Sequence, residues 1–459
     1  MRLLLKIMMM VGLTIAILVP LMMIRGTIQE RQMYRREAVQ TVARSSAGAQ
    51  AFSGPVLIVP YTELVEVEEK DNAGFTRKVQ REEAKQWIFF PETLEADGTM
   101  KPVVRKIGLH EVRKYEFDTK LNAQFRASVP GDAGAFAPRK IGQPYLSYAI
   151  ADVRGVIGLQ TLTVNNQKPE LLQGPGSGDG GGLHARLPAT VAGATIILDT
   201  SLKFTLEGTE SLAIAPLAKR NIIKIASPWP HPLFNGDFLP RNRSIGDKGF
   251  RAEWEISSLA SNAQAQYLSG ARVPGMAPAG SVDAEHMDQA VTGLDAIGVS
   301  LVEPVNIYTQ ADRASKYGIL FVVLTFVGFF MFELIKQLRI HPIQYGLVGL
   351  ALAIFFLLLV ALSEHIEFGQ AYLAASVACI GLLGYYVSHV LRSLLRGLGF
   401  AVMLATLYGA LYGLLISEDN AMVLGAGLLF LILAAIMIVT RKIDWYSVGA
   451  VAPPSLPQD

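Results

Sequence analysis

The sequence predicts a multi-domain membrane protein that combines a large all-β, sandwich-like domain with a transmembrane bundle of one plus five helices. Three observations predict this fold class. Six apolar stretches have the length of roughly 20 residues that a helix needs to cross the hydrocarbon core of a bilayer. Five of them lie nearly end to end in the last third of the chain. The long interval after the first stretch has an ordinary soluble composition and the period-two alternation of β-strands.

Each apolar stretch is predicted to form one membrane-spanning helix. The stretches cover residues 7–24, 317–335, 343–362, 371–390, 398–416 and 421–440. Core helices of a soluble protein seldom follow one another in this way, so the lipid bilayer is the first predicted partner. Arg2 and Lys6 precede the first stretch as in a secretory signal. No small-x-small cleavage site follows it, so we predict an uncleaved anchor.

The polar ends of the stretches predict the orientation. Basic residues gather at one set of ends: Arg2, Lys6, Lys336, Arg339, Arg392, Arg396, Arg441 and Lys442. The opposite loops, 363–370 and 417–420, contain acidic residues and neither Lys nor Arg. Because basic loops stay in the cytoplasm, both termini are predicted to be cytoplasmic and the large domain periplasmic, in a bacterial inner membrane. Arg25, Arg31, Arg35 and Arg36, just after the first stretch, argue the other way.

These boundaries predict four parts. They are an N-terminal transmembrane anchor (1–24), a periplasmic β-sandwich domain (25–316), a five-helix transmembrane bundle (317–440) and a cytoplasmic tail (441–459). Residues 29–44 are rich in helix formers and are predicted to extend the first helix out of the membrane.

Within the large domain, alternation of apolar and polar residues predicts many antiparallel strands in two sheets. Apolar residues occupy the odd positions of 115–129 other than Thr119, and the even positions of 202–206 and 250–256. Shorter apolar runs, 56–59 and 87–90, each stop at a proline, which is typical of strand ends. The absence of a helical period between these runs favours a β-sandwich.

Composition excludes several classes of function. The chain is 51% hydrophobic and 17% charged, with a net charge of +2, which predicts no nucleic-acid partner. The one cysteine, Cys379, lies in an apolar stretch, so the large domain has no disulfide and no thiolate metal site.

No motif for catalysis or for a cofactor is found. The large domain contains His110, His184, His231 and His286, but none has metal-ligand spacing to another. The glycine-rich run 174–182 has no following Lys-Ser/Thr and is interpreted as a loop rather than a phosphate cradle. We therefore predict no enzyme, no metal and no cofactor. A hydrolase built from residues that meet only in space has the least support.

The densest signal is the proline- and aromatic-rich segment 227–240, SPWPHPLFNGDFLP. Two interpretations stay open: a loop that plugs one end of the sandwich, or an apolar surface that binds a partner. The candidate partner-binding residues are Trp229, Pro230, His231, Phe234, Asp237 and Phe238.

Two polar residues inside the apolar stretches are candidates for an intramembrane site. Glu333 and His389 both lie near the cytoplasmic ends of their helices. Such residues mark transport pathways when they lie at mid-membrane, but here both can reach the interface with their polar ends.

Several motifs resemble the CreD family of bacterial inner-membrane proteins, also called cell envelope integrity proteins. They are SGPVLIVP (53–60), the segment 229–240, DRASKY (312–317), HPIQY (341–345), SEH (363–365) and IDWY (443–446). The resemblance implies one plus five spans, a periplasmic domain, and a place in a two-component envelope-stress regulon. It also implies a role in envelope integrity and in tolerance to envelope-directed agents. It implies no reaction, and therefore no catalytic residues.

Two hypotheses follow. The first is a non-enzymatic envelope protein whose β domain binds a periplasmic protein or an envelope component. The alternative is a transporter or exporter that moves a small amphiphile through the helical bundle. The sequence predicts no oligomeric state.

Overall fold

The computed structural model describes residues 2–70, 76–108, 110–133, 135, 137–176, 180–271, 293–301, 307–336, 340–416 and 421–441. The chain forms two compact units. The helical unit comprises residues Met1–Tyr34 and Val305–Asp459, and the β unit comprises Arg35–Pro304. Each unit is described by itself.

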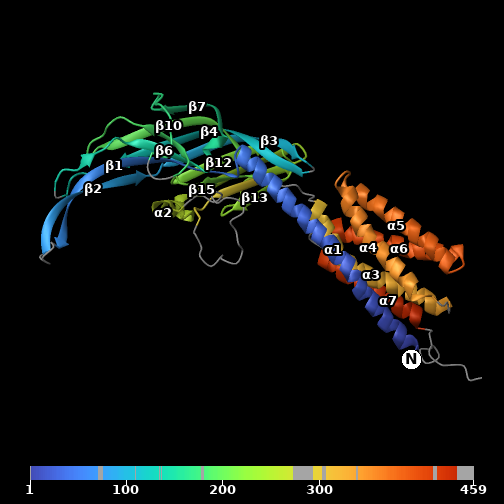
Figure 1. Ribbon diagram of the computed structural model, residues 1–459. Helices are drawn as coiled ribbons and strands as arrows, with labels where there is room; N and C mark the ends of the chain where they lie inside the picture. The colour runs from blue at the N-terminus through green and yellow to red at the C-terminus, as the bar shows by residue number, and fades with distance from the viewer. Residues whose placement is uncertain are drawn as a thin grey trace, which may run out of the picture. The chain divides into compact units, whose positions relative to one another are not determined.

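The first helix, α1, is one continuous helix from Arg2 to Ser45 (Figure 1). The predicted polar extension of the first apolar stretch is therefore confirmed. Its early residues contribute to the core of the helical unit, and its last turns belong to the β unit.

The other predicted apolar stretches are also helices. They are α3 (Ile307–Lys336), α4 (Pro342–Ser363), α5 (Phe368–Val390), α6 (Leu394–Ile416) and α7 (Ala421–Thr440). Among the described residues, α1, α3, α4, α5 and α6 are long and apolar enough to cross a membrane, and α7 contains a shorter apolar stretch, Val423–Ile438. Each of the pairs α3–α4, α4–α5 and α5–α6 is in contact, and α3 also contacts α6.

Ion pairs hold α1 to its neighbours within the helical unit. Arg25 Nε lies 3.8 Å from an oxygen of Asp312 in α3. Arg31 Nε lies 3.3 Å from an oxygen of Glu364, which follows α4. Two of the arginines that conflicted with the predicted orientation therefore have acidic partners, and this compensates for the desolvation of their charge.

The β unit contains two sheets. Sheet A consists of nine strands, and seven of them follow the order β13-β16-β11-β1-β6-β9-β8, while β2 and β5 pair with β1. Its strands are β1 (Gln50–Lys70), β2 (Thr76–Phe89), β5 (Lys140–Ile141), β6 (Tyr145–Ile150), β8 (Leu172–Gln173), β9 (Gly182–Arg186), β11 (Ser211–Ala215), β13 (Pro232–Gly236) and β16 (Ile297–Leu301). A short helix, α2 (Ala263–Leu268), precedes β16.

Sheet B consists of seven strands in the order β14-β15-β12-β3-β4-β10-β7. They are β3 (Thr93–Ile107), β4 (His110–Ser128), β7 (Val156–Val164), β10 (Thr195–Thr209), β12 (Arg220–Ser227), β14 (Asn242–Gly246) and β15 (Gly249–Ser257). Most pairs are antiparallel, as predicted. Two pairs, β1–β11 and β3–β12, are parallel, and the long intervals between their strands provide the crossover connection that a parallel pair needs.

One apolar core joins the two sheets. It includes Phe52 of sheet A and Phe204 of sheet B, whose ring centroids are 5.6 Å apart. The predicted inward positions, among them Phe117, Phe125 and Trp254, are buried. The alternation in the sequence was therefore interpreted correctly, and the predicted all-β domain with a helical membrane part is confirmed.

The expectation that the strand at 56–59 ends at Pro60 was wrong. Strand β1 continues through Pro60 to Lys70. Pro60 is tolerated because it lies between the residues of β1 that pair with β6 and those that pair with β5. No ladder hydrogen bond from its missing N–H is needed there.

Residues Leu57–Lys70 of β1 pair with β2 in a long hairpin, and ion pairs join the two strands along its surface. Lys85 lies 2.7 Å from Glu63, and Lys78 lies 3.0 Å from Glu66. The hydrogen bond from Lys85 holds the pKa of Glu63 below its ordinary value. Beside these ion pairs the rings of Tyr61 and Trp87 stack at 3.9 Å.

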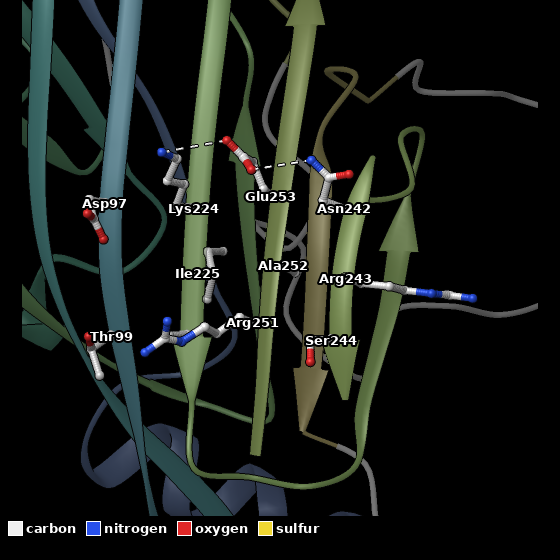
Figure 2. Close-up of a pocket in the computed structure, with 11 residues that line it drawn as sticks. Asp97, Thr99, Lys224, Ile225, Asn242, Arg243, Ser244, Arg251, Ala252 and Glu253 are labelled. Carbon is white, nitrogen blue, oxygen red and sulfur yellow. Dashed lines mark hydrogen bonds and ion pairs between the residues drawn. The ribbon is translucent and has the colours of Figure 1, made fainter. Parts of the chain in front are cut away.

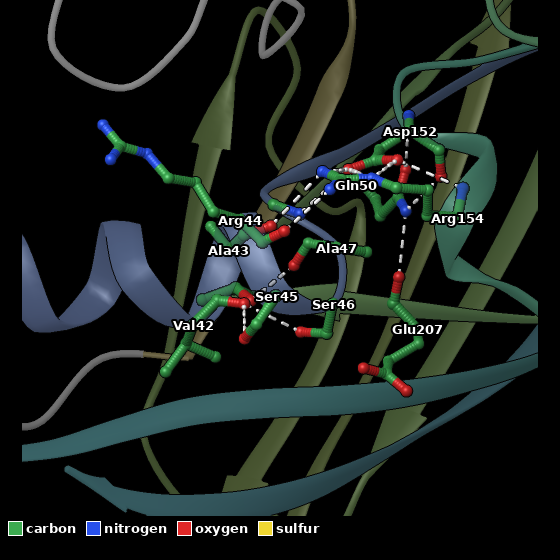
Figure 3. Close-up of polar contacts among 12 residues, drawn as sticks. Val42, Ala43, Arg44, Ser45, Ser46, Ala47, Gln50, Asp152, Arg154 and Glu207 are labelled. Carbon is green, nitrogen blue, oxygen red and sulfur yellow. Dashed lines mark hydrogen bonds and ion pairs between the residues drawn. The ribbon is translucent and has the colours of Figure 1, made fainter.

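A polar clamp fixes the end of α1 within the β unit (Figure 3). Arg154 donates hydrogen bonds to the carbonyls of Arg44 and Ala43, at 2.8 and 3.3 Å. These carbonyls belong to the last turn of α1, where no intrahelical donor remains. Burial raises the pKa of Asp152, but hydrogen bonds from Arg154 outweigh it and hold that pKa below its ordinary value.

Gln50 lies at the centre of this clamp and is 1% exposed. Its amide nitrogen donates to the carbonyls of Asp152 and Glu207, both at 2.9 Å. Its amide oxygen accepts from the backbone N–H of Asp152 at 3.2 Å. One side chain therefore joins the start of β1, the turn before β7, and β10.

Candidate functional site: a polar groove on sheet B

The exposed face of sheet B is organised in cross-strand rows of polar side chains. One row runs Asn242, Glu253, Lys224 and Asp97 over β14, β15, β12 and β3. Lys224 Nζ lies 3.6 Å from Glu253, and Asn242 donates to Glu253 at 3.4 Å (Figure 2). Because Glu253 has both partners, the charge at the centre of this row is largely compensated.

The next row differs because it contains a basic side chain without a carboxylate partner. It runs Ser244, Arg251, Ala226 and Thr99 over the same four strands. Figure 2 shows Arg251 extended across β12 toward Thr99, and the register sets Ala226 of β12 between these two residues. Within the part of the chain that the structure describes, Arg251 makes no ion pair. We call these four residues the open row.

The open row is the floor of a groove. Two neighbouring hollows, of about 590 and 580 Å³, have all four residues of the open row in common. One extends over Asp97, Lys224 and Glu253, and the other extends toward Lys248 and Pro228. Volumes of this size are typical of small-ligand sites.

The aromatic segment predicted from the sequence begins at the end of this groove. Pro228 lines the groove, and Trp229 lies beneath the guanidinium of Arg113, 5.3 Å from the ring centroid. Phe234 meets Phe250 and Trp254 edge to face, at 5.6 and 5.7 Å. These half-buried rings therefore extend the core of the β unit.

The polar residues of the segment fasten it to the sheets. Trp254 Nε1 donates to the carbonyl of Phe238 at 3.0 Å. Asp237 accepts a hydrogen bond from the N–H of Ala296 at 2.9 Å. Pro230 is half-buried, and His231 is exposed with its carbonyl bonded to Trp229 Nε1 at 3.0 Å. The structure thus brings the predicted residues together; whether they bind a partner stays a prediction.

Strand β13 of this segment and the following strand β14 lie at sheet edges, but their composition disfavours addition of another strand. Within the described residues, β13 and β14 each pair on one side only. Pro232 begins β13 and offers no backbone donor. Arg243 of β14 pairs with the buried Ala252, and so places a charge on the core-facing side of the edge. Prolines and inward charges are the usual protection of sheet edges, so the groove on the face is the better candidate site.

The Phe234→Ala substitution is expected to lower the free energy of unfolding by about 2 kcal/mol, because it removes a half-buried ring from the core. Leu233→Ala is the matched control, since this neighbour in the same strand is 52% exposed and is expected to cost less than about 0.5 kcal/mol. Denaturant unfolding of both variants measures the difference. Equal stability of the two variants would contradict the packing of Phe234.

The two intramembrane candidates lie in different surroundings. Glu333 is 4% exposed, and its carboxylate accepts from the hydroxyl of Tyr345 at 2.9 Å and from the N–H of Ile340 at 3.4 Å. It therefore joins α3 to the first turn of α4 and to the residue Ile340 that precedes it. His389 is exposed, and its Nδ1 lies 3.0 Å from the carbonyl of Tyr385. The structure does not bring the two residues together in one site.

Sequence reasoning missed the groove. Arg251, Ala226 and Thr99 occur in separate strands, and only the register of sheet B makes them neighbours. The sequence did show polar residues at every second position of the strands, but we interpreted them only as the solvent-exposed face of a sheet. Among the described residues no group of histidine, cysteine and carboxylate side chains could hold a metal ion. His286 lies outside the described residues.

Comparison with known proteins shows which family this chain matches. A family model described as "Inner membrane protein CreD" matches residues 2–446. The inner membrane protein CreD of Escherichia coli (strain K12) is 35% identical over 438 residues, which cover 95% of this chain and 92% of the relative.

Solved structures give only distant matches. An M1 zinc metallopeptidase from Deinococcus radiodurans matches 36% of this chain and 38% of its own, at 9% identity and a TM-score of 0.18. Yeast LTA4 hydrolase in complex with bestatin matches 52% of this chain and 34% of its own, at 8% identity and a TM-score of 0.19. Scores this low support no conclusion about this chain.

Proposed function

Because this chain belongs to the CreD family of inner membrane proteins, we propose that it is a non-enzymatic protein of the bacterial cell envelope. In this proposal both termini are cytoplasmic, the β unit is periplasmic, and its groove binds an envelope component. The binding contributes to envelope integrity under stress.

The single observation that carries the proposal is the groove on sheet B. It combines hollows of ligand size with polar side chains from four strands, of which the open row has its charge uncompensated. On the same face of sheet B, Lys101 is paired with Asp118 and Arg220 with Glu255. Lys120 and Lys203 make no ion pair among the described residues, but they do not line the groove. Uncompensated polar groups gathered in a hollow are the usual mark of a binding site.

The topology rests on the charge of the helix ends. The α4–α5 connection contains Glu364 and Glu367, and the α5–α6 connection contains Arg392. Basic connections stay in the cytoplasm, so the start of α5 and the start of α6 face opposite sides in this proposal.

The topology is tested by labelling introduced cysteines with a membrane-impermeant maleimide. The background is Cys379→Ser, which removes the one native thiol. Leu159→Cys, at a position of the β unit that is 95% exposed, is expected to react in intact spheroplasts. Arg441→Cys, at the exposed residue that follows α7, is expected to react only after the membrane is permeabilised. The reverse pattern would overturn the topology.

Binding in the groove is tested in the same cells. Ser244→Trp adds a bulky side chain over the open row, while Leu159→Trp adds the same side chain at a distant exposed site. In a strain that lacks the chain, Ser244→Trp is expected to restore tolerance to an envelope-directed detergent at least tenfold less well than Leu159→Trp, at equal amounts in the membrane. Equal tolerance would remove the groove from the proposed function.

A further inference from the structure

We propose that the open row is a phosphate subsite, and that the groove binds a phosphate ester whose other end carries hydroxyl or ammonium donors. This inference rests on the proposed function and names the ligand class of that same groove. The argument uses the charge of the open row, the hydrogen-bonding groups around it, and the carboxylate at the far end of the groove.

Arg251 provides the charge. A guanidinium is planar and offers two parallel N–H groups, which match two oxygens of a phosphate. The cross-strand neighbour of Arg251, Ala226, has only a methyl group, which leaves the guanidinium open to an anion in the hollow. Lys248 lines the same hollow and makes no ion pair among the described residues. The two cations therefore create a local positive potential in this hollow.

Neutral donors complete the subsite. The hydroxyls of Thr99 and Ser244 stand at the two ends of the open row, on either side of Arg251 and Ala226. Both residues are exposed and line both hollows. A hydroxyl can donate to a phosphate oxygen that the guanidinium leaves free.

Asp97, at the other end of the groove, determines which kind of group the bound phosphate can be attached to. Asp97 lies two residues from Thr99 on the same face of β3, a separation of about 7 Å. Asp97 makes no ion pair among the described residues, although the register places Lys120 and Lys224 opposite it on the neighbouring strands. Glu253 in the same row is occupied by Lys224 and Asn242. An exposed carboxylate repels a second anion and accepts from hydroxyl or ammonium groups. The groove is therefore complementary to a group that is anionic at one end and a donor at the other.

Two sources can supply this chemistry: a soluble phosphate ester and a phospholipid headgroup. Calorimetric titration of the full chain in phosphatidylcholine nanodiscs distinguishes them. The probes are O-phosphoethanolamine, inorganic phosphate, and the soluble short-chain lipid dihexanoyl phosphatidylethanolamine. Binding of the first probe as tightly as the third indicates that the ester is sufficient; binding of the third alone indicates a lipid headgroup. Either result supports the phosphate subsite.

Variants make the test specific. Arg251→Gln is expected to weaken the binding of each probe that binds by at least about tenfold, as loss of a charge-assisted bidentate contact does. Arg220→Gln is the matched control, because it removes the same charge from the same sheet at a residue paired with Glu255, and it is expected to leave binding unchanged. Asp97→Asn is expected to weaken phosphoethanolamine several-fold and not inorganic phosphate.

Two results would overturn the inference: no binding of any probe, or equal weakening by Arg251→Gln and Arg220→Gln. Far-ultraviolet circular dichroism confirms that each variant is folded. If phosphate binding fails while Ser244→Trp still abolishes tolerance in cells, the groove keeps its proposed function and only the ligand class is wrong.

Discussion

Replacing Gln50 with leucine is expected to lower the free energy of unfolding of the β unit by about 3 kcal/mol. Leucine keeps the volume but removes all three hydrogen bonds of the Gln50 amide. The carbonyls of Asp152 and Glu207 lose a donor, and the N–H of Asp152 loses its acceptor. Each buried polar group that loses its partner costs about 1 to 3 kcal/mol. The expected total is at the lower end of the sum because water can hydrate the half-buried Asp152 in part.

Thermal or denaturant unfolding followed by tryptophan fluorescence measures this effect, because Trp87, Trp229 and Trp254 all belong to the β unit. The matched control is Gln160→Leu. Gln160 also donates to two carbonyls, those of Ile157 and Gly158, but at a partly exposed position of the edge strand β7. It is expected to cost less than about 0.5 kcal/mol. A Gln50 variant as stable as this control would show that the clamp is unimportant for stability.

The second large effect is expected in the helical unit, at Glu333. Glu333→Ala is expected to destabilise this unit by about 3 kcal/mol, because the hydroxyl of Tyr345 and the N–H of Ile340 are left buried without this acceptor. For a unit of this size the midpoint of thermal unfolding in detergent is expected to fall by about 5 to 10 °C.

His389→Ala is the control for Glu333→Ala, because His389 is exposed and its loss strands no buried partner. The pair of variants also separates two interpretations of Glu333. A structural role predicts a lower midpoint, and Tyr345→Phe is then expected to lower it as well. An unchanged midpoint combined with loss of amphiphile flux in proteoliposomes would favour the transporter hypothesis instead.

Periodicity in the sequence was sufficient to predict the elements of both units. The apolar runs became helices because only a helix satisfies its own backbone in lipid, and alternation at 115–129 became β4 because one face of that strand meets the core. The boundaries were less predictable. Helix α3 begins at Ile307, ten positions before the apolar run at 317, since polar residues such as Asp312 continue a helix without adding to its apolar run.

The candidate site required information that a sequence does not contain. Phe234 and Leu233 are neighbours of similar character, yet Phe234 packs on Trp254 and Leu233 is 52% exposed. The pattern of the segment allowed both a plug and a recognition surface, and only the pairing of β13 with β16 decides which side chain faces inward. Likewise, Glu333 could reach the interface by its position in the chain, but it is buried against Ile340 and Tyr345.

The ion pairs of the hairpin formed by β1 and β2 make its stability dependent on the salt concentration. Its ion pairs, such as Lys78 with Glu66, are exposed, whereas the stacked rings of Tyr61 and Trp87 are uncharged. Raising ionic strength from 0.1 to 1 M shortens the electrostatic screening length from about 10 to about 3 Å. High salt is therefore expected to weaken the exposed ion pairs of this hairpin and to leave the stacking of Tyr61 on Trp87 in place.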